Sequence, residues 1–413
     1  MTLKKFYRQS LQERRLNISP YLENKMDFPI LDEKRANQMI ENYLYTYGLP
    51  MGILPTIQVN EKDYIVPMVT EEPSVIAAAS NGAKHLGNIK AHLDRKTIKG
   101  QIVLTDWTEA EAKQALNKHK EGWLSFAKKV AYRMVERGGG PLDIEYSAYR
   151  SNQTLYHSYY LLFDPCEAMG ANSLNTVLEA LAFEIKKDIG GKVLMAILSN
   201  YNPQNFVKVE ATLSIERIDI NLDRAHPIAQ KIAMASDYAQ LDPYRATTHN
   251  KGIMNGVDAV LIATGNDWRA VEASVHAFAC KEGKYRGLSQ WFYDSKKAEL
   301  SGHMDIPLPV ATVGGTLSIH PMAKWSLNLM GNPNALELAQ VVASVGLAQN
   351  FAALKAIVSE GIQKGHMGLQ ARSLAIQVGA KADEIDLLVK LLKVRESFNS
   401  QIARDLLDKM RNS

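Results

Sequence analysis

The sequence predicts a mixed α+β protein in which a helix-rich body carries an inserted unit of strands and helices. Helical patterns fill roughly the first 95 residues and dominate again from Pro227 onward. Between about residues 98 and 203, short apolar runs alternate with amphipathic segments. The final segment, Asp383–Met410, repeats apolar residues at helical spacing. It predicts an amphipathic helix or helix pair, most simply packed on its own domain.

The expected elements can be placed in chain order. A helix should start at Pro73, because proline suits a first helical turn and an alanine run follows it. The glycines at 138–140 and 190–191 should end the two helices of the inserted unit. The strands and helices expected in and just after that unit cover Gln101–Thr105, Glu109–Val135, Ser158–Phe163, Asn175–Ile189, Lys192–Leu198 and Phe206–Ile215.

Composition bounds the class of protein. The 413 residues are enough for two or three domains. The net charge is +4 and no basic run exceeds a pair, so nucleic acid is not expected as a partner. Cys166 and Cys280 suggest no disulfide framework and a reducing compartment. The N-terminus lacks the apolar region of a signal peptide, and runs such as Val257–Thr264 are too short to cross a membrane. A cytoplasmic location is expected.

Several common site motifs are missing from the sequence. It contains no G-x-G-x-x-G, no P-loop, no H-E-x-x-H and no G-x-S-x-G. No histidines or cysteines stand at metal-ligand spacing, so no metal is expected. If a dinucleotide binds, it must bind by a scheme other than the Rossmann fingerprint.

Polar segments rich in glycine or proline are candidates for chemistry. Glu72 precedes the helix expected at Pro73, where an acidic residue could simply favour the helix dipole. The segment Arg245–Gly256 is interpreted as a partly enclosed loop whose Lys251 could stabilise an oxyanion, or could be a solvated loop lysine. Asp267 follows an apolar, strand-like run, and either Asn266 or Asp267 could cap the next helix. His366, between two glycines, could act as a general acid or be a surface histidine.

Together these segments resemble the 3-hydroxy-3-methylglutaryl-CoA (HMG-CoA) reductase family, in particular its soluble bacterial class II. The resemblance runs from Phe6 to the C-terminus. The matching stretches are EEPSVIAAAS (71–80), EAMGAN (167–172), RATTHNKGIMNGVDAVLIATGNDWRAVEAS (245–274), VGLAQN (345–350) and GIQKGHM (361–367).

The resemblance implies four catalytic residues and a reduction of HMG-CoA to mevalonate and CoA by two hydrides. Lys251 would stabilise the oxyanion formed at each hydride transfer. Glu72 would donate protons to the carbonyl oxygen, and Asp267 would couple it to Lys251. His366 would protonate the departing CoA thiolate.

The resemblance also implies binding residues. Substrate contacts would be Ser74, Arg245, Asn255 and Arg8, although Arg8 could be a solvated terminal charge. Dinucleotide contacts would be Met169, Gly170, Asn172 and Asn200. Two positions depart from the usual family pattern: Glu167 stands where the loop usually begins with Asp, and Gln370 where a second histidine is common.

The cofactor is expected to be NADPH. NADH-using relatives carry an acidic residue seven positions before the triple glycine, where it can accept a hydrogen bond from the ribose 2′-hydroxyl. Here that position is Ala131, with Lys128, Lys129 and Arg133 nearby. Loss of the acid in a basic neighbourhood favours a 2′-phosphate.

The resemblance implies three domains and a homodimer with its active site at the subunit interface. Residues 1–97 and 204–360 would bind the substrate and CoA. Residues 98–203 would form a small, ferredoxin-like, non-Rossmann unit for NAD(P), and 364–413 a mobile C-terminal flap. Two alternatives stay open: mevalonate oxidation with NAD by the same enzyme, and a non-catalytic CoA-binding regulator.

Overall fold

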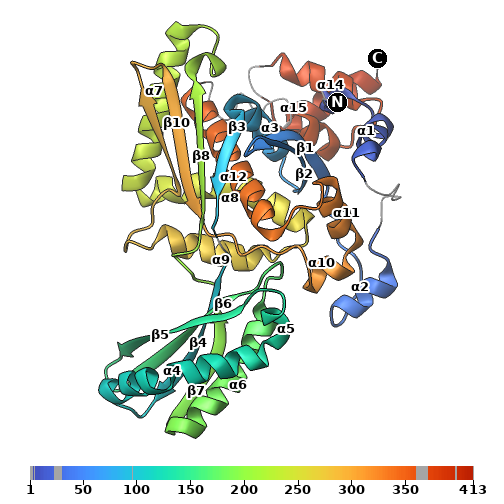
Figure 1. Cartoon of the computed structure of the whole chain (residues 1–413). Helices are drawn as coiled ribbons and strands as arrows, with labels where there is room; N and C mark the ends of the chain where they lie inside the picture. The colour runs from blue at the N-terminus through green and yellow to red at the C-terminus, as the bar shows by residue number, and fades with distance from the viewer. Residues whose placement is uncertain are drawn as a thin grey trace.

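The computed structural model describes residues 3, 5–22, 30–94, 96–359, 371–395 and 398–412. Helices and two β-sheets make up these residues, which confirms the mixed α+β class. A large body holds one sheet and most helices, and a smaller unit with the second sheet projects from it (Figure 1).

The sheet of the large body has six strands in the order β2-β1-β3-β8-β10-β9. Their bounds are β1 Met51–Val59, β2 Lys62–Val69, β3 Asn88–His92, β8 Val207–Ser214, β9 Ser289–Asp294 and β10 Glu299–Ile306. The β1–β3 pair is parallel and every other pair is antiparallel. The chain enters the small unit after β3 and returns at β8, so these two neighbouring strands carry both connections.

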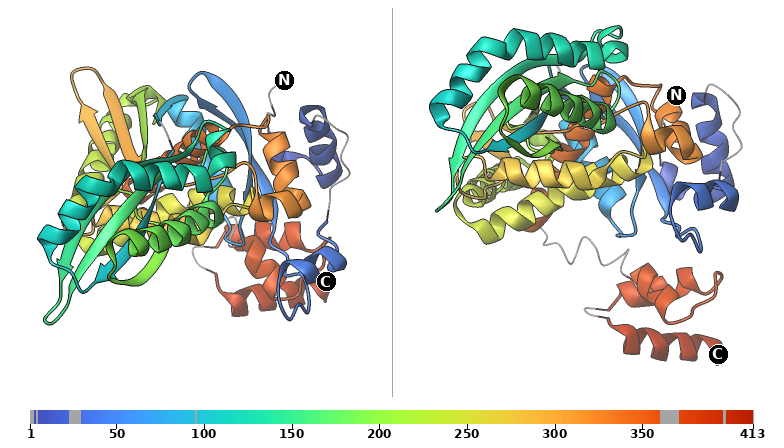
Figure 2. Two further views of the ribbon diagram at one scale, coloured as in Figure 1. Left: turned by 60° about the horizontal axis from the view of Figure 1, so that its bottom comes forward. Right: turned by 90° about the horizontal axis from the view of Figure 1, so that it is seen from below.

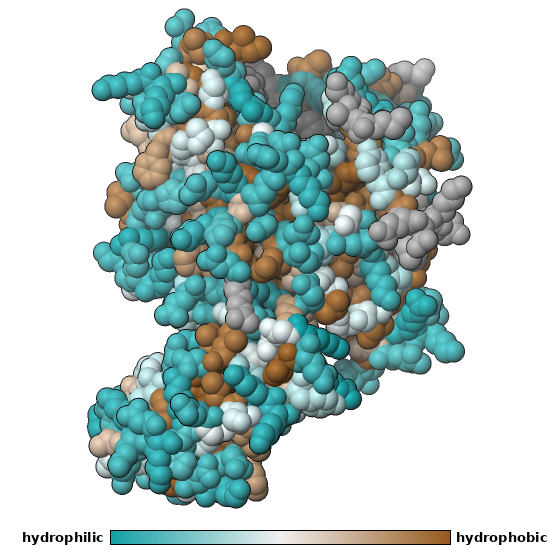
Figure 3. All heavy atoms as spheres, in the orientation of Figure 1, coloured by the Kyte–Doolittle hydropathy of each residue, from teal (hydrophilic) through white to brown (hydrophobic). Residues whose placement is uncertain are grey.

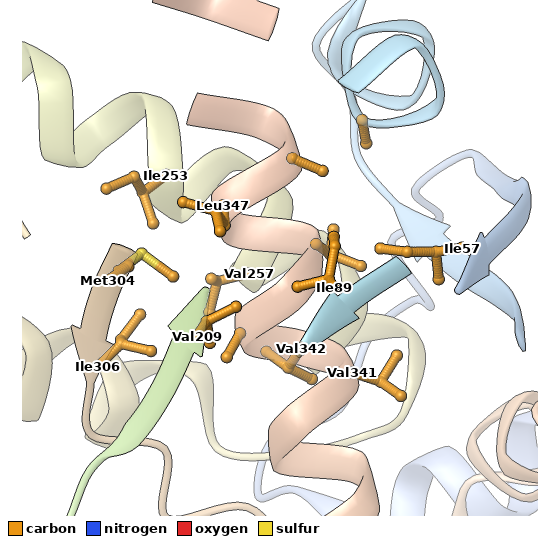
Figure 4. Packing of buried hydrophobic residues seen from close by; sticks show 14 of the residues in the cluster. Ile57, Ile89, Val209, Ile253, Val257, Met304, Ile306, Val341, Val342 and Leu347 are labelled. Carbon is orange, nitrogen blue, oxygen red and sulfur yellow. The ribbon is translucent and has the colours of Figure 1, made fainter. Parts of the chain in front are cut away.

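Helices cover this sheet, and one of them, α12, is almost fully buried (Figure 4). Val341, Val342 and Leu347 of α12 are fully buried, and Figure 4 shows them in one cluster with Val209 of β8 and Ile253 of α8. The helices of the body are α3 Val75–Leu86, α7 Leu222–Leu241, α8 Pro243–Ala263, α9 Trp268–Ala279, α10 Gly315–Ile319, α11 Pro321–Leu329 and α12 Ala335–Val358, with the short η3 Ile215–Arg217.

The small unit has the chain order β-α-β-β-α-β, apart from the short α5, and a four-stranded antiparallel sheet. Its sheet order, β5-β6-β4-β7, is the arrangement of a ferredoxin-like fold. Trp123 and Phe163 are buried in its separate core. Its elements are β4 Ile98–Thr105, α4 Glu109–Val130, α5 Tyr132–Val135, β5 Gly140–Arg150, β6 Leu155–Asp164, α6 Ala171–Ile189 and β7 Lys192–Ser199.

Short helices occupy both ends of the chain. At the N-terminus, η1 Phe6–Arg8, α1 Leu11–Ile18 and η2 Ser19–Tyr21 pack on the body near Trp325, and α2 Glu33–Met39 follows. At the C-terminus, residues 371–377, α14 Ile385–Lys393 and α15 Ser400–Arg411 enclose a small apolar core of their own (Figure 2). The helix pair predicted for Asp383–Met410 is therefore confirmed.

Several strands contradict the sequence prediction. The N-terminal part is not mostly helical, because β1, β2 and β3 lie within it. Prolines at 55 and 67 disguise β1 and β2, and β9 and β10 mix polar and apolar residues in a region interpreted as helical. The small unit contains β5, which was also missed, since only three of its eleven residues are buried and its apolar pattern is weak.

Within the described part of the chain, one helix is long and apolar enough to cross a membrane. It is α12, so the expectation that all apolar runs are too short was wrong. Of its most apolar window, 72% is buried inside the protein. A helix that is apolar all round is suited to such a core position. The face of the molecule drawn in Figure 3 is mostly hydrophilic, with scattered apolar residues.

Candidate active site

The side chains of Lys251 and Glu72 meet in an ion pair. Lys251 Nζ donates a hydrogen bond of 2.8 Å to Glu72 Oε2. Glu72 lies in the turn between β2 and α3, where its backbone N–H donates to the Thr70 hydroxyl. Ser74 ends this turn in the left-handed region, at φ 80°. That unusual conformation for a non-glycine residue sets the direction in which the chain enters α3.

Lys251 lies in the middle of α8, so the prediction that Arg245–Gly256 forms a loop was wrong. The side chain of Asp242 caps this helix and Pro243 occupies its first turn. Gly256 lies within α8, at a point where this helix packs closely on α12. A Cβ at Gly256 would lie 3.1 Å from the side chain of Gln349. The strand-like run that follows is the buried last part of the same helix, and a short apolar run does not distinguish these cases.

The ion pair borders a cavity of about 220 Å³ between α3, α8 and α12. Three of the predicted substrate residues, Ser74, Arg245 and Asn255, line it, as do the two catalytic candidates Glu72 and Lys251. The cavity therefore brings together five predicted residues that are up to 183 positions apart in the chain. Sequence reasoning missed four further polar lining residues: Thr248, His249, Gln349 and Asn350. Their signal was available, since they fall within the RATTHNKG and VGLAQN stretches.

Several buried polar atoms of this wall have no hydrogen-bond partner among the described residues. They are Ser74 Oγ, Arg245 Nε, His249 Nδ1 and Gln349 Oε1. Burial also lowers the pKa of Arg245. Buried polar groups are normally paired, so a cluster of unpaired ones beside one cavity suggests a site shaped for a polar ligand.

A buried network surrounds the His249 ring. Trp291 Nε1 can only donate, and it donates to Asn350 Oδ1 over 2.8 Å. The Asn350 amide nitrogen therefore faces His249 Nε2, at 3.1 Å, and the Ser289 hydroxyl lies 2.7 Å from the same ring nitrogen. Burial, assisted by the charge of Arg245, lowers the pKa of His249 to about 4.

The side chains of Lys251 and Glu72 are more exposed to solvent than is expected for a site that excludes water. The Lys251 side chain is 58% exposed and that of Glu72 is 43% exposed. The expectation of a partly enclosed lysine therefore does not hold for the described part of one chain. An ion pair this exposed contributes only about 0–1 kcal/mol to stability.

Asp267 lies outside the cavity of Glu72 and Lys251. It is the N-cap of α9, as predicted, and its side chain accepts a hydrogen bond from the Ala270 backbone over 3.1 Å. Lys251 stands 12 residues before the end of α8, at Ala263. That is roughly 18 Å along the helix axis. Within one chain the two side chains therefore lie apart.

Asp267 instead lines a second cavity, of about 320 Å³. Met169, Gly170 and Asn172, the predicted dinucleotide residues, line the same cavity. Gly170 is the N-cap of α6 at φ 89°, and it offers no capping side chain to the first backbone N–H groups of the helix. A Cβ at Gly170 would lie 2.4 Å from the side chain of Pro165. The loop thus presents helix N–H donors of the kind that bind phosphates.

Two more predicted cofactor positions lie next to this second cavity or near it. Asn200 lines a small adjoining cavity that it shares with Met169. Ala131 is the C-cap of α4 and borders a groove with Arg133, Arg137 and Ser173. None of the nine residues lining this groove is acidic. Lys128 and Lys129, which suggested a basic environment, lie outside its lining, and Arg137 was not predicted.

Two predicted residues are not in either cavity. Arg8 belongs to the exposed η1, and its guanidinium donates to the Tyr7 hydroxyl. His366 lies outside the described residues, as does Gln370. Among the residues that are described, no group of three or more His, Cys, Asp or Glu side chains could hold a metal ion.

Comparison with known proteins gives one consistent family. The family model described as "Hydroxymethylglutaryl-coenzyme A reductase" matches residues 9–371. The 3-hydroxy-3-methylglutaryl-coenzyme A reductase of Archaeoglobus fulgidus is 37% identical, over 98% of this chain and 94% of its own. A probable enzyme of the same name from Borreliella burgdorferi is 32% identical, over 99% and 95% of the two chains.

Solved structures agree with these relatives. A 3-hydroxy-3-methylglutaryl-coenzyme A reductase from Streptococcus pneumoniae has a TM-score of 0.83 and 41% identity, with all of both chains covered. A second structure is the class II enzyme from the same organism, bound to NADPH in open conformations. It has a TM-score of 0.82 and 43% identity, over 98% of this chain and all of the other.

Proposed function

This chain belongs to the hydroxymethylglutaryl-coenzyme A reductase family and is an oxidoreductase, and on that premise we propose the reaction, the cofactor and the assembly of its site. The reaction is HMG-CoA plus two NADPH and two protons, giving mevalonate, CoA and two NADP⁺. The observation that carries this proposal is the 2.8 Å contact between Lys251 and Glu72 at the mouth of a polar cavity. This contact joins the cation of Lys251 and the carboxyl group of Glu72, the proposed carrier of the proton. Both lie beside groups able to orient an acyl chain.

The residues of the first cavity divide the work on the substrate. The Arg245 guanidinium, half-buried on α8, suits the free carboxylate of the acyl group. Lys251 is placed to donate to the thioester oxygen as negative charge develops there. Glu72, held at Lys251, is placed to deliver a proton to the same oxygen. His366 is retained as the residue that protonates the thiolate of CoA.

The second cavity suits the dinucleotide. The uncapped N-terminus of α6 at Gly170 would receive its phosphates, and Asn200 would lie on the nicotinamide side. When bound, the dinucleotide supplies the hydride. Asp267, which lines this cavity, would face the reacting carbon from the cofactor side and extend the proton network of Glu72.

We propose that a second copy of the chain brings the two cavities together. Two observations support this assembly: Asp267 lies far from Lys251 within one chain, and Lys251 and Glu72 remain exposed in it. A further apolar surface is available on the segment between α2 and β1, where Leu44, Tyr45 and Tyr47 are 76–87% exposed. Large exposed apolar groups of this kind mark interaction sites.

NADPH is proposed over NADH. The groove beside Ala131 holds two arginines, Arg133 and Arg137, and no acidic side chain. Neither guanidinium has an ion-pair partner among the described carboxylates, and Arg133 Nε donates to the neutral Tyr132 hydroxyl over 2.8 Å. A 2′-phosphate would find two cations there, whereas a ribose 2′-hydroxyl would find no carboxylate to accept its hydrogen bond.

The architecture supports the domain assignment as a proposal. Residues 1–97 and 204–360 would be the substrate domain, residues 98–203 the NAD(P) domain, and residues 364–413 the flap. The separate apolar cores of the body, the small unit and the C-terminal helices support this division. We also propose a cytoplasmic location, in keeping with the burial of α12, the one described helix apolar enough to span a membrane.

The test is the HMG-CoA-dependent oxidation of NADPH and of NADH, followed by absorbance. The wild-type protein should oxidise two NADPH per HMG-CoA, and Lys251→Ala should lose about a hundredfold or more of kcat, because removing one oxyanion donor costs that much. Lys284→Ala, an exposed lysine remote from either cavity lining, is the matched control and should retain full activity. Binding of CoA without oxidation of either cofactor would favour the regulator instead.

A further inference from the structure

A buried lysine lies where the small unit joins the body. Lys96 stands between β3 and β4, on the first of the two chain connections, and is 4% exposed. Its Nζ donates hydrogen bonds of 2.7 Å to the carbonyl oxygen of Ala168 and 2.8 Å to that of Val310. Lysine is almost never this buried without a specific partner. Nothing in the reaction described above uses it.

The two carbonyls belong to two of the three segments that line the dinucleotide cavity; the third is residues 265–267. Ala168 precedes Met169 and Gly170 in the loop between β6 and α6. Val310 lies in the segment from β10 to α10, which contributes Ala311 and residues 313–317 to the same cavity. One ammonium group therefore joins two of the segments that line that cavity.

A second tie reinforces this one from the other side of the loop. The carboxylate of Glu167 accepts hydrogen bonds of 2.7 Å from the Thr312 hydroxyl and from the Ala335 backbone at the start of α12. Thr312 in turn donates its backbone N–H to the Glu167 carbonyl, and Ala168 pairs with Val313 as a parallel bridge. Glu167, although unusual at this position, thus fixes the loop to the body.

Burying an ammonium is a poor way to gain stability. Desolvation opposes its charge, and replacing it by an apolar side chain would leave the carbonyls of Ala168 and Val310 without this donor. Burial does lower the pKa of Lys96, to about 8, although Glu167, Asp164 and Cys166 favour its charged form. The cation is best explained by what it holds in place: charge-assisted hydrogen bonds define the positions of two carbonyls more closely than apolar contacts can.

We propose that Lys96 is a positioning residue for cofactor binding, which holds the loop 165–170 against the segment 308–313 so that Gly170 and α6 meet the dinucleotide. This proposal rests on the proposed function, because it takes the second cavity to be the dinucleotide site. It adds a residue that borders the small adjoining cavity of Asn200 and that acts through the loop it holds. Its effect should therefore appear in cofactor affinity and not in the affinity for HMG-CoA.

The test is Lys96→Met, which keeps the length of the side chain and removes its charge and donors. KM for NADPH should rise about tenfold, the size expected for one lost charge-assisted hydrogen bond, while KM for HMG-CoA stays within about twofold. Lys99→Met is the matched control. Lys99 lies three residues further along and pairs with Glu145 at the sheet of the small unit, so its removal should leave both constants unchanged.

Two results would overturn the proposal. One is equal change of both KM values in a folded Lys96→Met protein, because that indicates general damage; the other is no change in either. If Lys96→Met does not fold, Glu167→Ala removes both side-chain hydrogen bonds of the companion tie and should give the same split between the two KM values. An equal change of both KM values in that variant would contradict the proposal as well. Direct titration of NADPH fluorescence reads the Lys96 effect even if HMG-CoA proves not to be the substrate, so the two proposals can fail separately.

Discussion

His249 illustrates how far burial can change the chemistry of one residue. It lines the substrate cavity, yet its ring is neutral at physiological pH because burial lowers its pKa to about 4. It can act there as a neutral hydrogen-bonding group, but not as a general acid. The proton for the leaving group must therefore come from elsewhere, and His366 stays the candidate.

The first prediction concerns stability at acid pH. The folded-state pKa of His249 lies below the usual 6.5, so between about pH 6.5 and pH 4 the unfolded chain binds a proton that the folded protein does not. The free energy of unfolding should therefore fall as the pH is lowered through this window, by at most about 1.4 kcal/mol per pH unit from this residue. Urea unfolding of wild type and of His249→Gln measures it, and the slope should be smaller in the variant. Parallel curves would contradict the assignment.

The sequence indicated which residues meet in space, but not the secondary structure or the exposure of those residues. It selected Glu72 and Lys251, and the structure brings them into contact. It expected Lys251 in an enclosed loop, whereas the lysine projects, exposed, from a helix. Glycines at 252 and 256 suggested a loop because glycine disfavours helices, but the tight contact with α12 requires a small residue at Gly256. Such a contact between distant segments leaves no local signal.

At the scale of elements, the packing of α3 on α12 depends on one small residue. Gly82 of α3 lies against the backbone of α12, and a Cβ there would be 1.9 Å from the Ala348 carbonyl oxygen. Because that oxygen belongs to a buried helix, neither helix can yield cheaply. The same contact positions the start of α3, and thus Glu72, against α8.

The second prediction follows from this contact. Gly82→Ala should destabilise the protein by about 1–3 kcal/mol or more, since the methyl group must push the helices apart. Gly122→Ala is the control: Gly122 also lies inside a helix, α4, and a Cβ there meets nothing within 4 Å. That change should be neutral or stabilise by up to about 1 kcal/mol. Thermal unfolding distinguishes the two, and equal melting temperatures would refute the close-packing argument.

The third prediction concerns the end of α4. Ala131→Asp should move the ratio of kcat/KM for NADPH to that for NADH by about tenfold or more toward NADH. The new carboxylate can accept a hydrogen bond from the ribose 2′-hydroxyl and repels a 2′-phosphate. Ser125→Asp adds the same charge to α4 at an exposed position outside the groove, so it should leave the ratio nearly unchanged. If both variants shift the ratio alike, the groove is not the 2′ site.

At the scale of the whole molecule, the mixed class and the inserted unit could be predicted, because alternation of strands and helices between residues 98 and 203 is a local pattern. The six-stranded sheet could not. Its strands come from three distant parts of the chain, and β1, β2, β9 and β10 lack the uniform apolar runs by which buried strands are found. The division of the site between two cavities was equally invisible, because spacing along the chain says nothing of separation in space.

The division of the site between two cavities has a genetic consequence. If each complete site takes Lys251 from one chain and Asp267 from its twofold partner, two inactive alleles can rescue one another. In a mixed dimer of Lys251→Ala and Asp267→Ala chains, one site carries both defects and the other carries neither. Random pairing of equal amounts should then restore about a quarter of the wild-type sites.

Co-expression of the two variants with different affinity tags, followed by the NADPH assay on the doubly purified dimer, measures this fourth prediction. Each variant expressed alone should be inactive, and the doubly tagged species should have about half the wild-type rate. An inactive mixed dimer would indicate that Lys251 and Asp267 of each site come from the same chain. A strain carrying the two alleles would in that case fail to grow where either parent fails, and the gene would behave as one indivisible unit of function.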